Sequence, residues 1–151
     1  MGKVHRDLAM KRSDALAELS RDHHQALFVA QRLIRATDAT AEAAHAAFEE
    51  FWNRERHHFR IEEEILLPSL ARHVPADHEA IVRVLTEHVD LRRRAADAAA
   101  DRATLQELGE RLRTHVRYEE RTLFALVETT LSEEELEELG AALARSHEQP
   151  A

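Results

Sequence analysis

The most informative absence in this sequence of 151 residues is cysteine, of which there is none. Disulfide bonds, thiolate metal sites and cysteine nucleophiles are therefore excluded. Glycine and proline are also scarce, with three of each, where average usage would give roughly eighteen of the two together. Because sandwiches and barrels need many turn residues, this scarcity disfavours an all-β fold. Long helices are expected instead.

Long hydrophobic runs and an excess of basic charge are missing as well. No stretch approaches the roughly 18 uninterrupted apolar residues of a membrane-spanning helix, so no membrane partner is expected. The first residues, MGKVHRDLAMKRSDALAEL, hold no continuous apolar segment of the kind found in secretory signals, and we expect a cytoplasmic protein. The net charge of −8 argues against nucleic acid as a partner, because binding the phosphate backbone needs a basic surface.

Apolar residues recur at the 3.6-residue spacing of helices in four long segments. These segments span residues 13–36, 41–67, 77–99 and 104–130. Pro68 is expected to end the second segment, because proline cannot continue the interior of a helix. Connections of only a few residues favour antiparallel neighbours. The sequence therefore predicts an all-α fold, an up-down-up-down four-helix bundle over about residues 13–130.

A fifth, shorter helix is expected after the bundle. Ser132 and Glu135 have the spacing of a capping box, which predicts a helix over about 133–145. Its apolar edge leaves two arrangements open: it packs on its own bundle, or on that of a second copy in a homo-oligomer. The whole chain, 1–151, is expected to form a single domain.

The most unusual feature of the composition is its eleven histidines. Each long segment places one histidine in the middle of its apolar face, and two segments add a glutamate four residues later, still on the inner face. These residues are His23, His58, Glu62, His88, His115 and Glu119. Burying unpaired carboxylates is costly, and a pair of divalent metal ions would compensate, because carboxylates can bridge two ions and imidazoles suit iron. His24 competes with His23, since a modest rotation of the first helix exchanges them.

The other polar residues near these positions receive structural interpretations. Glu63 and Glu120 are expected on the outer or flanking face of their helices, with a supporting role behind the ligands as the alternative, and His57 is expected opposite the core. Tyr118 lies one turn from His115, which makes a hydrogen bond into the site an open alternative.

Four strings of the sequence resemble the hemerythrin-like family, also called HHE cation-binding domains. The strings are SRDHHQAL (20–27), HFRIEEEILLP (58–68), TEHVDLRR (86–93) and HVRYEERTLF (115–124). The resemblance implies a four-helix bundle that holds two non-heme iron ions in an oxo- or hydroxo-bridged diiron centre. It further implies that Glu62 and Glu119 bridge the irons and that the terminal ligands are His23 (or His24), His58, His88 and His115.

One difference from the oxygen-carrying hemerythrins bears on function. Those proteins have a second histidine on the third helix, where this chain has Val84, and an aspartate one residue beyond the position of Glu119. Losing one imidazole leaves an additional coordination position, as redox chemistry on a small ligand requires. Three functions remain open: binding or sensing of oxygen, nitric oxide or peroxide; diiron oxidoreductase activity on peroxide or an organic substrate; and a metal-free helical interaction module.

Overall fold

The structure, a computed structural model, describes residues 12–148, and within this range all regular structure is helical. The prediction of an all-α fold is confirmed. The elements are η1 (Asp14–Leu16), α2 (Ala17–Ile34), α3 (Ala41–Ile61), η2 (Glu62–Leu66), α4 (Leu67–Leu70), α5 (Glu79–Asp97), α6 (Arg102–Tyr118), η3 (Glu119–Leu123), α7 (Phe124–Thr130) and α8 (Glu133–His147). The predicted single domain also includes residues 1–11 and 149–151, which lie outside the described range.

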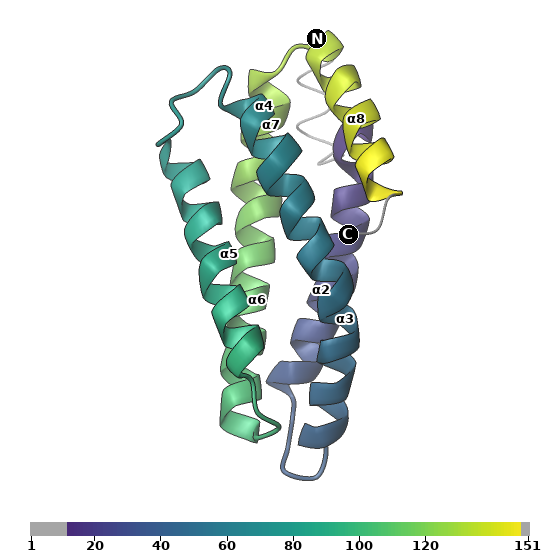
Figure 1. Cartoon of the computed structure of the whole chain (residues 1–151), viewed down its shortest axis with the longest axis vertical. Helices are drawn as coiled ribbons and strands as arrows, with labels where there is room; N and C mark the ends of the chain where they lie inside the picture. Colours follow the sequence, from purple (N-terminus) through teal and green to yellow (C-terminus); the bar gives the residue numbers. More distant parts are fainter. Residues whose placement is uncertain (1–11, 149–151) are drawn as a thin grey trace.

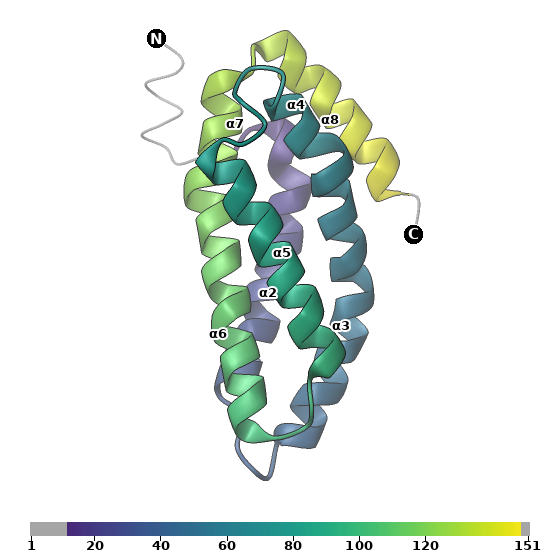
Figure 2. The same cartoon turned by 60° about the vertical axis from the view of Figure 1, so that its left-hand side comes forward.

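Four long rods lie side by side along the longest axis of the molecule (Figures 1 and 2). Two of them are composite, because α3 continues through η2 into α4, and α6 continues through η3 into α7. Loops at one end join α2 to α3 and α5 to α6, and a loop at the opposite end joins α4 to α5. The last helix, α8, lies outside the four rods.

The second rod does not stop at Pro68, contrary to the sequence prediction. The turn before it is a π-helical turn, in which the Leu67 N–H bonds to the carbonyl of Glu62 five residues earlier. Pro68 thus lies in the first turn of α4, directly after the π turn, where its fixed φ suits the helical backbone. The rod continues to Leu70.

The fifth helix, α8, begins with the predicted capping box. The Ser132 side chain accepts the Glu135 N–H, and the Glu135 carboxylate accepts the Ser132 N–H. The helix packs back on its own bundle, against η1, η2 and α3. Its last turn covers His57, whose Nε2 donates to the carbonyl of Ser146 at 3.0 Å. His57 is therefore half-buried, although the helical periodicity of its own segment places it opposite the core.

The core consists of two apolar clusters at different heights of the bundle. The cluster nearer α4, α7 and α8 contains Leu66, Leu70, Leu123 and Leu139 among others. The other cluster fills the space among α2, α3, α5 and α6. A layer of buried histidine and glutamate side chains separates them along the rods. The fold thus encloses a polar site between two apolar layers.

The first and fourth rods approach each other closely at Gly109. A Cβ atom at this position of α6 would lie 2.8 Å from the carbonyl oxygen of Ala30 and 2.9 Å from the Cβ of Leu33, both in α2. Glycine is therefore required here by space rather than by backbone conformation. This contact fixes the distance between the two helices that carry His23 and His115.

Candidate metal centre

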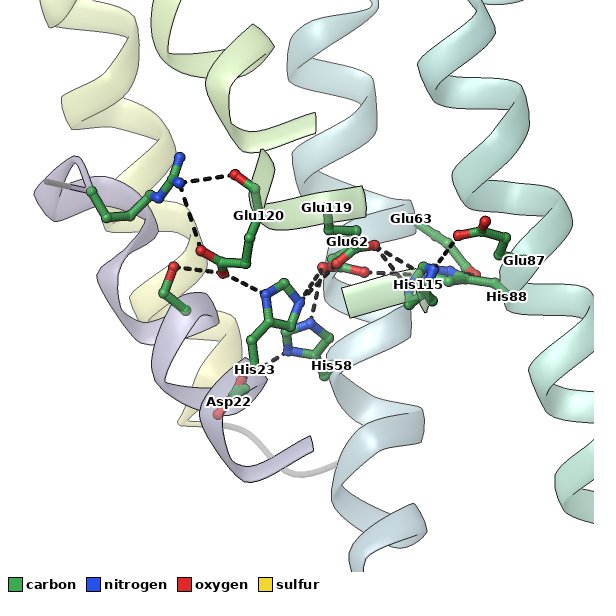
Figure 3. A network of polar contacts seen from close by, with 12 residues as sticks. Asp22, His23, His58, Glu62, Glu63, Glu87, His88, His115, Glu119 and Glu120 are labelled. Carbon is green, nitrogen blue, oxygen red and sulfur yellow. Dashed lines mark hydrogen bonds and ion pairs between the residues drawn. The ribbon is translucent and has the colours of Figure 1, made fainter. Parts of the chain in front are cut away.

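Each of the four long rods contributes one buried histidine to the polar layer. His23 lies in α2, His58 in α3, His88 in α5 and His115 in α6, and none of these side chains is more than 2% exposed. Glu62 and Glu119 join them and are fully buried, at 0% exposure. Figure 3 shows the six side chains converging from four helices. The structure thus brings together every residue that the sequence predicted for the metal site.

Both glutamates are the first residues of π-helical turns. η2 begins at Glu62 and η3 begins at Glu119, and each turn closes with an N–H bonded to the glutamate carbonyl five residues earlier. A π turn widens the helix locally and occurs often at functional sites. The sequence prediction of uninterrupted α-helices is wrong at these two positions. The residues that differ from α-geometry are the two carboxylates expected to bridge metal ions.

The carboxylates connect two pairs of histidines. Glu62 Oε2 lies 2.9 Å from His58 Nε2, and Glu62 Oε1 lies 3.1 Å from His88 Nε2. Glu119 Oε1 lies 2.8 Å from His23 Nε2, and Glu119 Oε2 lies 3.1 Å from His115 Nε2. Each carboxylate therefore presents one oxygen to the His23–His58 pair and the other to the His88–His115 pair.

Two groups of four ligand atoms follow from this arrangement. In each group all atoms lie within 4.8 Å of one another, and both groups share the two glutamates. Several of these atoms are buried without a hydrogen-bond partner, although they lie close together. They are His58 Nε2, His88 Nε2, His115 Nε2, both oxygens of Glu62, and Glu119 Oε2. Buried polar atoms are almost always paired, so a donor set of this kind fits cations placed between the atoms.

In each of the four site histidines, Nδ1 points away from the centre of the site and bonds to a carboxylate of a neighbouring rod. The Nδ1···O distances are 2.6–2.9 Å, and the pairs are His58–Asp22, His88–Glu63, His115–Glu87 and His23–Glu120. A carboxylate accepts the proton on Nδ1, which leaves the lone pair of Nε2 directed at the centre of the site. All four imidazoles are thus held in the orientation that a metal ligand needs.

These four bonds form a closed ring around the bundle. Each rod supplies a carboxylate to the histidine of the next rod in chain order, and the last rod supplies one to the first. We call this arrangement the carboxylate ring, with members Asp22, Glu63, Glu87 and Glu120. Figure 3 shows how its members surround the inner six residues.

Further side chains hold the carboxylate ring from outside. Arg92 donates two bonds to Glu63, at 2.8 and 3.1 Å, and Arg83 donates one to Glu87 at 2.8 Å. Asp22 contacts His147 of α8 at 3.0 Å. For Glu63 and Glu120 the alternative, a place behind the ligands, is therefore the one that the structure shows, and Asp22 and Glu87 are site residues that sequence reasoning missed. Their signal was present, since each ring carboxylate is adjacent in sequence to a predicted ligand.

Burial and charge act in opposite directions on the ionisation of these groups. Burial lowers the pKa of His23, but the hydrogen bonds that its ring donates to Glu119 and Glu120 raise it, and the pKa is about 9. The pKa of His115 is also about 9, because the interactions of its ring with the carboxylates of Glu119 and Glu87 exceed the effect of burial. Burial raises the pKa of Glu63, but its histidine and arginine partners lower it to about 2. The site therefore concentrates negative charge that a cation or protons must balance.

Aromatic rings cover the two histidine pairs. Phe59 stacks on His88 with ring centroids 3.8 Å apart and meets the ring of His115 edge-on at 5.5 Å. Phe124 stacks on His23 at 5.1 Å. These rings exclude water from the ligand atoms and restrict the rotation of the imidazoles.

The structure decides between the neighbouring histidines of α2. His23 points into the site, whereas His24 is exposed. Tyr118 forms no side-chain hydrogen bond within residues 12–148, and its ring packs instead against the Arg83 guanidinium at 3.8 Å. Val84 is fully buried on α5, one turn before His88, so the third rod offers a single imidazole.

Sequence reasoning also missed Glu55. This residue of α3 is 3% exposed, and its Oε2 is buried with no hydrogen-bond partner among the described residues. Burial raises the pKa of its carboxyl group, while nearby histidines lower it by a smaller amount. It lies three residues before His58, at a spacing that places both on one side of the helix.

Two further findings concern the chain as a whole. No helix within residues 12–148 has the length and the hydropathy needed to cross a bilayer. Comparisons with curated proteins and with solved structures give no match. The model of one protein family, the Hemerythrin HHE cation binding domain, matches residues 14–127. This match covers most of the chain and all six inner site residues, and the protein therefore belongs to the hemerythrin HHE cation-binding family.

Proposed function

We propose that the protein holds two non-heme iron ions in a carboxylate-bridged centre and binds or senses oxygen, nitric oxide or peroxide. The ligands are His23, His58, His88 and His115 as terminal groups and Glu62 and Glu119 as bridges. The four long rods correspond in this proposal to the up-down-up-down bundle of the family, with α8 as an addition.

The observation that carries the proposal is the division of each carboxylate between two histidine pairs. One oxygen of Glu62 and one of Glu119 face His23 and His58, and the other two oxygens face His88 and His115. A single ion would need only one such group. Two carboxylates shared by two groups suit two ions side by side.

The residues of the chain hold the ligand atoms ready for these ions. The carboxylate ring keeps each Nδ1 protonated, because a carboxylate accepts only from an N–H, and so directs each Nε2 toward the positions of the ions. The apolar clusters and Phe59 keep bulk water away from the ligand atoms, which strengthens every electrostatic interaction among them. Bound iron would supply the electron exchange that oxygen, nitric oxide or peroxide chemistry needs.

Metal content is the first test of this proposal. Elemental analysis of the purified protein should give about two irons per chain, and its absorption spectrum should change on reduction and reoxidation. Glu62→Ala and His115→Ala should each lose most of the iron. Full retention of two irons by these variants would refute the ligand assignment, and a protein that takes up no anaerobic ferrous iron would refute the proposal itself.

A diiron oxidoreductase is the second candidate, favoured by the buried Val84. With no second imidazole on the third rod, each group offers four protein ligand atoms. Iron accepts more ligands than this, so positions remain for a reacting molecule. Sustained turnover of hydrogen peroxide that depends on Glu119 would favour an enzyme, whereas a stoichiometric spectral change would favour binding. A metal-free interaction module requires that chelation leave fold and partner binding unchanged.

A further inference from the structure

A pocket of about 550 Å³ lies beside the metal site, outside the six inner residues. It is formed by α2, by α3 and by the last turn of α8, and its wall includes Asp22, Gln25, Phe51, Glu55, His57 and His147. Its volume is within the usual range for small-molecule sites, about 300–1,000 Å³. It is far larger than a water molecule or a diatomic gas requires, since a water occupies about 30 Å³.

The pocket wall contains two buried atoms that lack a hydrogen-bond partner within residues 12–148. One is Oε2 of Glu55, a side chain that is 3% exposed. The other is Nδ1 of His57. Because His57 Nε2 lies 3.0 Å from a carbonyl oxygen, this nitrogen is the donor and Nδ1 is left as an acceptor.

Both unpartnered atoms are thus suited to accept hydrogen bonds. Burying such groups without partners destabilises a fold, so their presence together in one wall indicates a ligand that brings donors. The aromatic side chains of Phe51 and the three histidines in the wall suit a flat, largely apolar body.

The pocket also reaches only one half of the metal site. Its wall includes His58 and the ring member Asp22, which belong to the His23–His58 half. The other half is covered by Phe59, which stacks on His88 at 3.8 Å. A molecule in this pocket would therefore lie beside the ion held by His23 and His58.

We propose that this pocket binds a small aromatic molecule bearing a hydroxyl or amino group, with the donor of the ligand directed at the carboxylate of Glu55. The proposal extends beyond the binding of gases or peroxide and does not require that the bound metal be iron. Gln25 is exposed on α2 and therefore lies at the rim, and His147 of α8 also lines the pocket.

Phenol and anisole are suitable probes, because they have the same ring but only phenol donates a hydrogen bond. Both would be titrated into zinc-loaded protein, which is silent in redox chemistry, and amide NMR shifts would report the affinity. Phenol should bind roughly tenfold more tightly than anisole, as one hydrogen bond to a carboxyl group implies. The largest shifts should occur at the amides of Gln25, Glu55 and His57.

Three variants test the assignment, each with its metal content measured first. Glu55→Leu should abolish the preference for phenol, and Glu55→Gln should retain most of it through the amide oxygen. Gln25→Trp should weaken both probes at least fivefold by filling the rim. His24→Trp is the matched control, since His24 is the next residue, is exposed and does not line the pocket.

Equal affinities of phenol and anisole for the wild type, or an unchanged preference in Glu55→Leu, would overturn the proposal. So would equal effects of the two tryptophan variants. These outcomes are distinct from a failure of the diiron proposal, because zinc-loaded protein gives them whether or not iron is the natural metal.

Discussion

Removing the carboxylate of Glu63 should weaken metal binding although Glu63 is not a proposed ligand. Its Oε2 accepts the Nδ1–H of His88 at 2.6 Å, and its two oxygens accept both bonds from Arg92. In Glu63→Ala the imidazole of His88 loses the group that fixes its orientation and its tautomer. Part of the free energy of metal binding is then used to order the His88 imidazole, and the metal affinity falls.

Two arguments give the size of this effect. A hydrogen bond to a charged group contributes about 1.5–3 kcal/mol. Loss of such a partner from a metal-binding histidine typically lowers metal affinity by about 10–100-fold, which corresponds to about 1.4–2.8 kcal/mol. Because 23% of the Glu63 side chain is exposed, solvent screens part of the interaction. We expect the lower part of this range, roughly tenfold to thirtyfold.

The adjacent residue provides the control for this experiment. Glu64 is on the same π turn, but its side chain is 63% exposed and contacts Arg60 rather than the site. Metal affinity would be measured anaerobically by competition with a chromophoric chelator, for Glu63→Ala, Glu63→Gln and Glu64→Ala. The Gln variant should be intermediate, since its amide oxygen still accepts from His88 but carries no charge toward Arg92. Affinities of Glu63→Ala and Glu64→Ala within threefold of each other would refute the reasoning.

Three further outcomes are expected. His24→Ala should keep the full metal content and His23→Ala should lose most of it, and elemental analysis of both variants would show the reverse if His24 were the ligand. Gly109→Ala should lower the free energy of unfolding by about 1–2 kcal/mol, because overpacking against the Ala30 carbonyl exceeds the gain in helix propensity; an unchanged urea midpoint would contradict the close contact. The metal-free protein should lose stability as pH rises from 6.5 to 9, because the pKa values of His23 and His115 are about 9 when folded and near 6.5 when unfolded. Added metal should reverse this trend, since it binds the unprotonated imidazoles, and melting curves of both forms across this pH range would show it.

The inner site residues were predictable because they break a pattern. Apolar residues recur on one face of each helix, and a histidine at the centre of that face is detectable from spacing alone. The choice of His23 over His24 could not be predicted from spacing, because it depends on the rotation of α2 about its axis, which packing against α6 determines. The contact at Gly109 is part of that packing.

The carboxylate ring was harder to predict for a different reason. Asp22 and Glu87 occupy flanking positions, where charged residues are ordinary, and only the neighbouring rod shows which histidine they meet. The π turns could not be predicted from the sequence pattern either. His58 and Glu62 are four residues apart in the sequence whether the following turn is α-helical or π-helical. The return of α8 over His57 depends on long-range contacts that periodicity does not report.

The closed order of the carboxylate ring has a consequence for the register of the helices. Apolar clusters alone tolerate a helix that slides along its axis, because one leucine can replace another in the same layer. In the ring every rod takes part in two links, one through its carboxylate and one through its histidine. A slide by a single residue moves a helix by about 1.5 Å, which is enough to break a short hydrogen bond on both of its sides. The polar layer thus selects one axial alignment of four helices from several that the apolar residues would accept, before any metal arrives.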